Sequence, residues 1–134
     1  MSSSFLPIGS LVSANIQFTH AETGESLPPQ KRPLLVLQDY GDGAVEVATI
    51  TSRIEKRHVK EYGHIIEKSL DYGLAKKSAV LCTRANRGIL ARENLSEPFG
   101  RLPFKEVKKV LQKSEKLNKM EHGLAYNLKS ELER

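Results

Sequence analysis

The apolar segments between residues 10 and 91 are short, and turn residues separate them. None is followed by a helical period long enough to cross between parallel strands. Short strands in close succession pair as antiparallel neighbours. The sequence therefore predicts one mainly β domain, a small antiparallel barrel, with strands at residues 12–18, 33–37, 44–50, 64–66, 78–83 and 88–91.

The individual segments predict more detail. Residues 12–18 alternate apolar and polar, which is typical of a half-buried strand, whereas the aliphatic run 33–37 indicates a strand buried on both faces. The turn residues at 40–43 predict that this run and residues 44–50 form a hairpin. Residues 19–31 read as a loop of about a dozen residues, a length that often accompanies function, and residues 51–62 as a charged turn.

A helical period begins at Pro103. Phe104, Val107 and Leu111 recur at spacings of three and four, and proline suits the first position of a helix. We expect Gly123 to interrupt this helix. A second short helix should follow, with an apolar stripe of Leu124, Leu128 and Leu132.

Charge is distributed unevenly over a chain of net charge +5. Residues 1–50 hold two basic and five acidic residues, whereas 51–134 hold nineteen and eleven. Such polarity attracts a polyanion, of which nucleic acid is the commonest in a cytoplasm. The lysines of the C-terminal helix fit an ordinary solvated face, so the basic residues outside it, among them Arg53, Arg84 and Arg87, are the better candidates for contact.

Other features exclude whole classes of protein. No apolar run approaches the ~20 residues that span a bilayer, and the first residues lack a secretory signal pattern, so we expect a cytoplasmic protein. The single cysteine, Cys82, lies in an apolar stretch and is expected to be a buried free thiol. There is no phosphate-binding glycine loop, paired cysteine or His-Glu-x-x-His motif, so neither a metal nor another cofactor is expected.

Two residues remain as candidates for chemistry. Arg32 precedes the aliphatic run and Thr51 follows the next strand, so a hairpin would bring both to its open end. Arginine offers a planar donor fork to phosphate, and threonine adds a hydroxyl. The alternative, favoured by spacing alone, is a surface arginine at a strand edge beside an ordinary turn residue.

Several segments, in order and spacing over residues 8–115, resemble the MazF/PemK toxin family. The most specific part pairs an Arg-Pro aliphatic strand with an Ile-Thr-Ser strand end. The matching segments are Gly-Ser-Leu-Val at 9–12, Lys-Arg-Pro-Leu-Leu-Val-Leu at 31–37, Val-Ala-Thr-Ile-Thr-Ser at 47–52, Gly-Leu at 73–74 with Ser-Ala-Val at 78–80, and Phe-Gly-Arg-Leu at 99–102.

The resemblance implies a homodimeric SH3-like barrel of the MazF/PemK/CcdB type with a C-terminal helix, spanning residues 1–119, and a helical extension at 120–134. It further implies a toxin of a type II toxin–antitoxin system, a metal-independent, sequence-specific endoribonuclease (mRNA interferase) that a cognate antitoxin inhibits. Such an enzyme cleaves single-stranded RNA through attack by the 2′-hydroxyl. The family's catalytic arginine and threonine carry over to Arg32 and Thr51, with Ser52 as a lesser site residue.

The chain also departs from the family. The acid or base usually drawn from the loop before the arginine is out of register, and His20, Glu22 or Glu25 are the substitutes available. A family Arg and Asp near residues 80–83 are missing. Two interpretations are open for Arg84 and Arg87, which lie just beyond this stretch: either they supply positive charge for RNA, or they are solvated loop residues. These departures keep an alternative open, a degenerate member that binds RNA or a protein target without cleaving. A gyrase-poison-like role is disfavoured because the chain lacks tryptophan and ends Leu-Glu-Arg.

Overall fold

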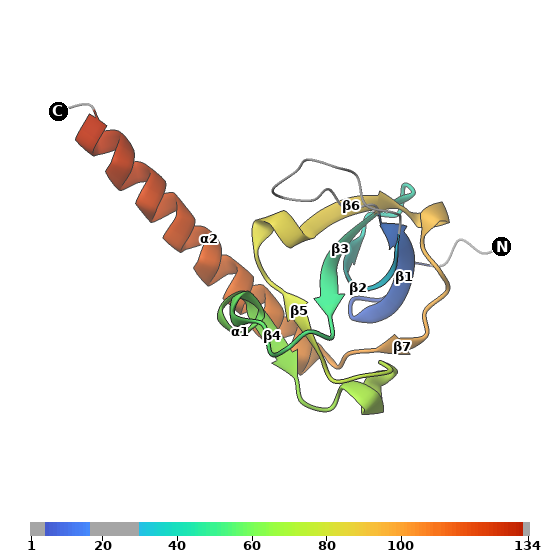
Figure 1. Cartoon of the computed structure of the whole chain (residues 1–134). Coiled ribbons are helices and arrows are strands. Elements are labelled where there is room, and N and C mark those ends of the chain that lie inside the picture. The colour runs from blue at the N-terminus through green and yellow to red at the C-terminus, as the bar shows by residue number, and fades with distance from the viewer. Residues whose placement is uncertain (1–4, 17–29, 133–134) are drawn as a thin grey trace.

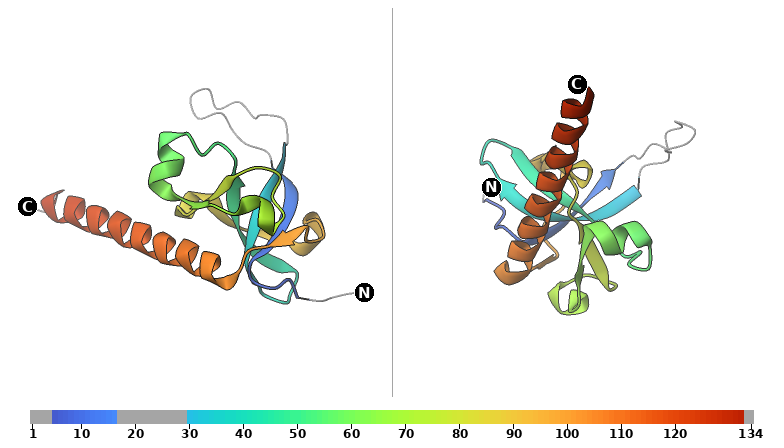
Figure 2. Two further views of the ribbon diagram at one scale, coloured as in Figure 1. Left: turned by 90° about the horizontal axis from the view of Figure 1, so that it is seen from below. Right: turned by 90° about the vertical axis from the view of Figure 1, so that its left-hand side faces the viewer.

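The computed structural model describes residues 5–16 and 30–132, and the side chains of its last helix as far as Lys119. The strands curl around a common interior, and the first half of the long C-terminal helix packs along one side of them (Figures 1 and 2). The second half extends beyond the barrel. The strands are β1 (Ser10–Ile16), β2 (Gln30–Asp39), β3 (Ala44–Thr51), β4 (Gly63–Ile66), β5 (Ser78–Leu81), β6 (Arg87–Ala91) and β7 (Gly100–Arg101). The helices are α1 (Arg57–Tyr62) and α2 (Phe104–Leu132), with short 3₁₀ turns η1 (Ser69–Tyr72), η2 (Arg84–Asn86) and η3 (Arg92–Asn94).

Every strand pair is antiparallel, in the order β4-β5-β3-β2-β1-β7, and β6 pairs with β3 outside this path. Strand β3 thus has three partners. One edge of β3 pairs with β2 over residues 45–49. The other edge pairs with β6 over residues 44–48 and then, from Ile50, with β5. The change of partner turns the sheet back on itself. The expected fold class, a small antiparallel barrel with a C-terminal helix, is confirmed.

Two apolar clusters fill the two faces of β1, β2 and β3. Alternate residues of each strand enter different clusters, so Leu34 and Leu35 belong to opposite sides. The cluster beneath α2 includes Leu11, Leu35, Leu37, Ile50, Ile66, Leu102, Val107 and Val110, and the other includes Leu6, Val12, Leu34, Val36, Val45, Val47 and Leu95. Residues 34–37 are buried on both faces, as expected. Strand β1 is also buried on both faces over 10–14, so the expectation of a half-buried strand was wrong.

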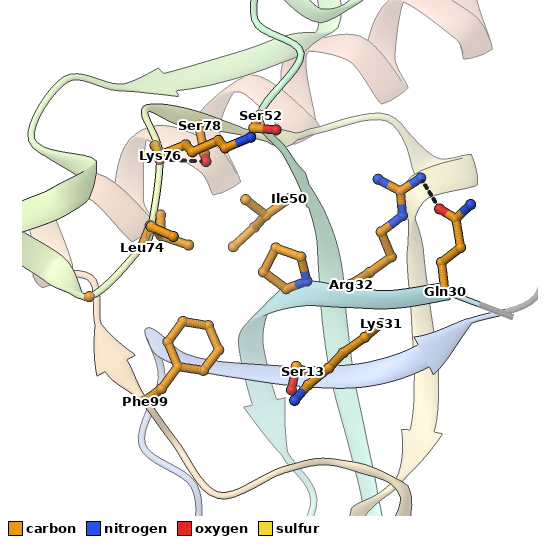
Figure 3. Close-up of a pocket in the computed structure, with 13 residues that line it drawn as sticks. Ser13, Gln30, Lys31, Arg32, Ile50, Ser52, Leu74, Lys76, Ser78 and Phe99 are labelled. Atoms are coloured by element: carbon orange, nitrogen blue, oxygen red, sulfur yellow. Dashed lines mark hydrogen bonds between the residues drawn. The ribbon is translucent and has the colours of Figure 1, made fainter.

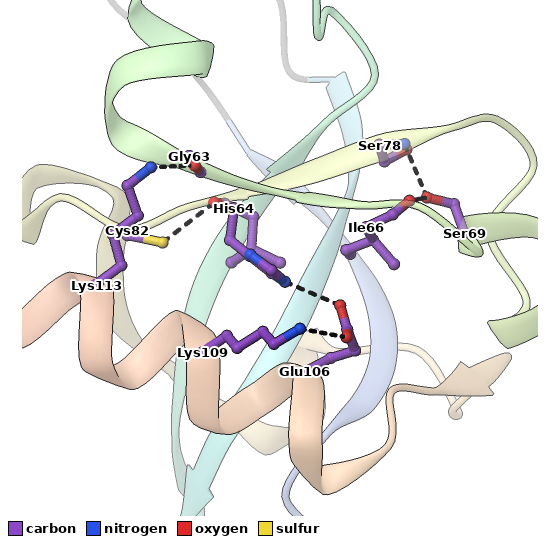
Figure 4. A network of polar contacts seen from close by, with 10 residues as sticks. Gly63, His64, Ile66, Ser69, Ser78, Cys82, Glu106, Lys109 and Lys113 are labelled. Atoms are coloured by element: carbon purple, nitrogen blue, oxygen red, sulfur yellow. Dashed lines mark hydrogen bonds and ion pairs between the residues drawn. The ribbon is translucent and has the colours of Figure 1, made fainter.

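Polar contacts fix α2 to the barrel (Figure 4). His64 Nε2 lies 2.9 Å from Glu106 Oε1, and Lys113 Nζ donates a hydrogen bond to the carbonyl oxygen of Gly63 at 2.6 Å. On another face Arg87 Nη1 donates to Ser114 Oγ at 2.8 Å. With Val107 and Val110 buried beneath it, the helix is held by apolar packing and by side-chain contacts from both flanks.

Three local expectations need correction. Strand β2 begins at Gln30, so Gln30 and Lys31 belong to a strand; the rest of the expected loop, to Pro29, lies outside the described residues. Pro33 is tolerated inside the strand because β3 pairs with β2 only from Leu34 onward, which leaves an edge there. Residues 57–62 form helix α1 instead of a turn; only Val59 is buried, so the helix leaves no apolar period in the sequence.

Gly123 does not interrupt the last helix, which runs from Phe104 to Leu132. An interior glycine costs a helix only about 1 kcal/mol relative to alanine, which is too little to end one. The division into residues 1–119 and 120–134 therefore cuts across a continuous helix and stays a prediction. Among the described residues, no helix is both long and apolar enough to cross a membrane.

The packing predicts which leucines stabilise the barrel. Leu35 is fully buried between the sheet and α2, so Leu35→Ala should lower the free energy of unfolding by about 2–5 kcal/mol through lost burial and the cavity left behind. Leu70→Ala is the matched control, because Leu70 is 66% exposed and its loss should change stability by less than about 0.5 kcal/mol. Urea denaturation measures both. Equal midpoints for the two variants would contradict the assigned core.

Candidate functional site

The open end of the β2–β3 hairpin borders a cleft of about 620 Å³. Segments distant in sequence form its walls: β2 where it begins, β3 where it ends, the chain between η1 and β5, and the residue before β7 (Figure 3). The lining residues are Ser13, 30–33, Ile50, Ser52, 73–76, Ser78 and Phe99. Sheet topology therefore brings together residues that are up to 86 positions apart in sequence.

Charge in this cleft has one sign. Lys31, Arg32 and Lys76 line it, and none of the described residues that line it is acidic. Ser52 adds a hydroxyl group, whereas the Ser78 hydroxyl already donates to the carbonyl oxygen of Lys76 at 2.8 Å. Pro33, Ile50 and Leu74 provide an apolar surface. Three cations and the Ser52 hydroxyl over an apolar floor suit an anionic ligand that also carries apolar groups.

Arg32 lies on β2 with its guanidinium oriented by a neighbour on the same strand. Its Nη2 donates a hydrogen bond to Gln30 Oε1 at 2.9 Å (Figure 3). Residues two apart on a strand share a face, so this contact follows from the extended conformation of β2. The planar fork of donors is thereby held at the edge of the cleft, where it can meet a phosphate.

The hairpin register places Thr51 at the same end as Arg32. Leu34 pairs with Thr49 in the antiparallel hairpin. Arg32 lies two residues before Leu34 and Thr51 two residues after Thr49, so both lie toward the open end and on the same face. Thr51 Oγ1 accepts a hydrogen bond from the Arg53 backbone N–H at 3.2 Å, so its own proton remains to be donated. Ser52, one residue on, lines the cleft, whereas Thr51 is not among its lining residues.

The other sequence candidates lie elsewhere. Arg53 is exposed just beyond the end of β3. Arg84 and Arg87 line a separate cleft beside α2, with Glu46 and Asn118. Arg87 is an internal contact, since its Nη2 lies 2.9 Å from Glu46 Oε2 and its Nη1 bonds Ser114. Neither of the roles weighed for Arg87, RNA contact or solvated loop, anticipated this contact.

His20, Glu22 and Glu25 lie outside the described residues, so their part in the site stays a prediction. Within the described ranges, no group of three or more His, Cys, Asp or Glu side chains is arranged to hold a metal ion. Cys82 is buried, as expected, and its thiol donates to the carbonyl oxygen of Val80 at 3.4 Å. Burial raises the pKa of the Cys82 thiol to about 11, so it is protonated and unreactive at neutral pH.

Sequence reasoning missed three members of the cleft that bear on its chemistry, Lys31, Lys76 and Phe99. Lys31 precedes Arg32 directly but was expected to belong to the loop 19–31. Lys76 stands in a polar stretch with no distinguishing pattern. Phe99 begins the Phe-Gly-Arg-Leu segment at 99–102, but nothing in that segment shows that its ring faces a cleft. Phe99 and Lys76 lie close in sequence to two glycines whose backbones touch, Gly100 and Gly73. A Cβ on Gly100 would come within 3.0 Å of the Gly73 Cα. Two glycines where backbones touch were the available signal.

The fold is shared with solved MazF structures. A crystal structure of MazF from Deinococcus radiodurans superposes with a TM-score of 0.61 at 21% identity, covering 85% of this chain and 96% of that one. The MazE-MazF structure from the same organism gives 0.59 at 22% identity, covering 87% and 99%. The Mycobacterium tuberculosis toxin MazF-mt6 gives 0.53 at 18%, covering 78% and 90%. No protein-family model and no curated protein sequence matches the chain. The barrel and its C-terminal helix are thus those of the MazF toxin structures.

Proposed function

We propose that this chain is the toxin of a type II toxin–antitoxin system and a metal-independent endoribonuclease that cuts single-stranded RNA in a sequence-specific manner. The observation that carries the proposal is the cleft at the hairpin end, whose charged residues, among those that the structure describes, are all basic and include Arg32 at its edge, in a barrel of the MazF fold. A homodimer and a cognate antitoxin, both implied by the family resemblance, belong to the same proposal.

The proposed reaction uses the substrate's own 2′-hydroxyl. That oxygen attacks the adjacent phosphorus, the bond to the 5′-oxygen breaks, and the products carry a 2′,3′-cyclic phosphate and a 5′-hydroxyl. Negative charge on the phosphoryl oxygens rises in the transition state, so the fixed cation of Arg32 lowers the barrier. DNA lacks the 2′-hydroxyl and is not cut.

Other residues of the cleft support this step. Lys31 and Lys76 attract the phosphates on either side of the cut bond. The Thr51 hydroxyl, oriented by the Arg53 N–H, donates to a phosphoryl oxygen. Arginine is a poor general base because its guanidinium offers donors and no proton acceptor. That role is left to the residues before β2 in the sequence, where His20, Glu22 and Glu25 are the candidates.

Replacement of the arginine tests the proposal. Purified protein incubated with long single-stranded RNA in EDTA should give specific cuts with 2′,3′-cyclic phosphate ends, and Arg32→Ala should lower the cleavage rate about 10²- to 10³-fold. Arg92→Ala is the matched control, because the Arg92 N–H bonds the carbonyl oxygen of Gly43 at the hairpin turn, the opposite end of β3.

Two results would count against the proposal. Cleavage unchanged in Arg32→Ala would remove the arginine from the mechanism. RNA that binds in the micromolar range without any cut, across several sequences, would favour the degenerate, binding-only alternative.

The two hydroxyls at the end of β3 give a second prediction. Thr51→Val removes the oriented donor at nearly constant volume and should lower the cleavage rate by at least about tenfold, since a lost transition-state hydrogen bond to a charged group is worth about 1.5–3 kcal/mol. Ser52→Ala should have the smaller effect and act mainly on KM, because Ser52 lines the cleft and is proposed to contribute to binding, whereas the oriented donor is Thr51. A greater loss of kcat in Ser52→Ala than in Thr51→Val would reverse these roles.

A further inference from the structure

Phe99 is an aromatic side chain at the wall of the cationic cleft. Its exposed fraction is 44%, and it belongs to none of the three core clusters that the described residues form. A single exposed apolar side chain is common on protein surfaces. This one differs because its backbone is fixed and its surroundings are those of an anion-binding cleft.

The backbone at Phe99 is held from two sides. Its N–H donates a hydrogen bond to the carbonyl oxygen of Leu11 on β1 at 2.9 Å. On the other side its own carbonyl oxygen would lie 2.8 Å from a Cβ on Gly73, a residue with φ of +111°, where only glycine fits easily. The ring can therefore move only through its two side-chain torsions. Ordering it against a ligand costs little side-chain conformational entropy.

The surroundings of the ring specify the chemistry of a ligand. Phe99 and Leu74 lie on one side of the cleft and Arg32 on the other (Figure 3). Lys31 and Lys76 complete the lining charge. A flat apolar face opposite a guanidinium, with further cations beside it, matches a nucleotide, whose base stacks while its phosphate meets the cations.

We propose that Phe99 is the stacking platform for a nucleobase next to the phosphate bound by Arg32. The inference rests on the proposed function, since it assigns the part of the RNA that this same site takes. Stacking is tolerant of base identity, because every base has a π-face, so Phe99 supplies affinity and register and leaves the choice of sequence to other contacts.

Binding of a non-cleavable RNA tests the inference. The probe is a short fluorescent RNA that spans a mapped cut and has a 2′-deoxy sugar there, or a mixed-sequence strand if no cut is found. Phe99→Leu keeps apolar bulk but loses the aromatic face, and it should weaken binding about 5- to 150-fold, while Phe99→Tyr retains affinity. Phe104→Leu is the matched control, since Phe104 is an exposed phenylalanine on α2 outside the cleft lining.

Abasic substitution then locates the base. Removing one base beside the cut should weaken binding to the wild type as much as Phe99→Leu does, and should weaken binding to Phe99→Leu no further. Wild-type affinity in Phe99→Leu, or abasic losses that add to the Phe99→Leu loss at every position, would overturn the inference while RNA cleavage stands. A wild type that neither cuts nor binds RNA would overturn both proposals, whereas binding that depends on Phe99 without cleavage would support stacking and reject catalysis.

Discussion

The pairing of β3 with three strands is the constraint on which the rest of the structure depends. One edge of β3 pairs with β2, and this pairing sets Arg32 and Thr51 at one end of the hairpin. Along the other edge it leaves β6 for β5, and this change brings the chain from Gly73 to Ser78 across from the start of β2. The cleft exists because β3 ends where β5 takes over. A substitution that disturbed the change of partner from β6 to β5 would displace the catalytic candidates together with the cations around them.

The cleft concentrates a charge that the composition only hints at. The net charge of +5 is spread over the whole chain, and many cations are matched locally, as Arg57 is by Glu61 and Arg87 by Glu46. Lys31, Arg32 and Lys76 all line one concave surface, and the lining residues that the structure describes include no acidic side chain. Like charges repel each other in such a cluster, so it is the kind of arrangement that an anionic ligand stabilises. Helix α2 packs on the apolar cluster that also contains Ile50 and Leu74 of the cleft lining, so it supports the floor of the cleft.

The sequence predicted those parts of the fold that rest on local patterns. The hairpin followed from the turn at 40–43, and the start of α2 followed from Pro103. The placement of Arg32 and Thr51 at the same end of the hairpin followed from the hairpin itself. Features set by contacts between distant segments were missed. Lys76 and Phe99 enter the cleft through the Gly73–Gly100 contact, and Arg87 is held by Glu46 and Ser114, which lie 41 and 27 positions away. Helix α1 was missed because one buried residue shows no period, and Gly123 was overvalued as a helix breaker.

The central claim is that the RNA's own 2′-hydroxyl is the nucleophile at this cleft. It is tested most directly by an RNA in which the single nucleotide before a mapped cut carries a 2′-deoxy sugar. If the 2′-hydroxyl is the nucleophile, this one bond becomes resistant while the same strand is still bound with unchanged affinity and still cut at its other sites. Cleavage of the deoxy bond at a comparable rate would mean that water or a protein group attacks the phosphorus, and would contradict the account.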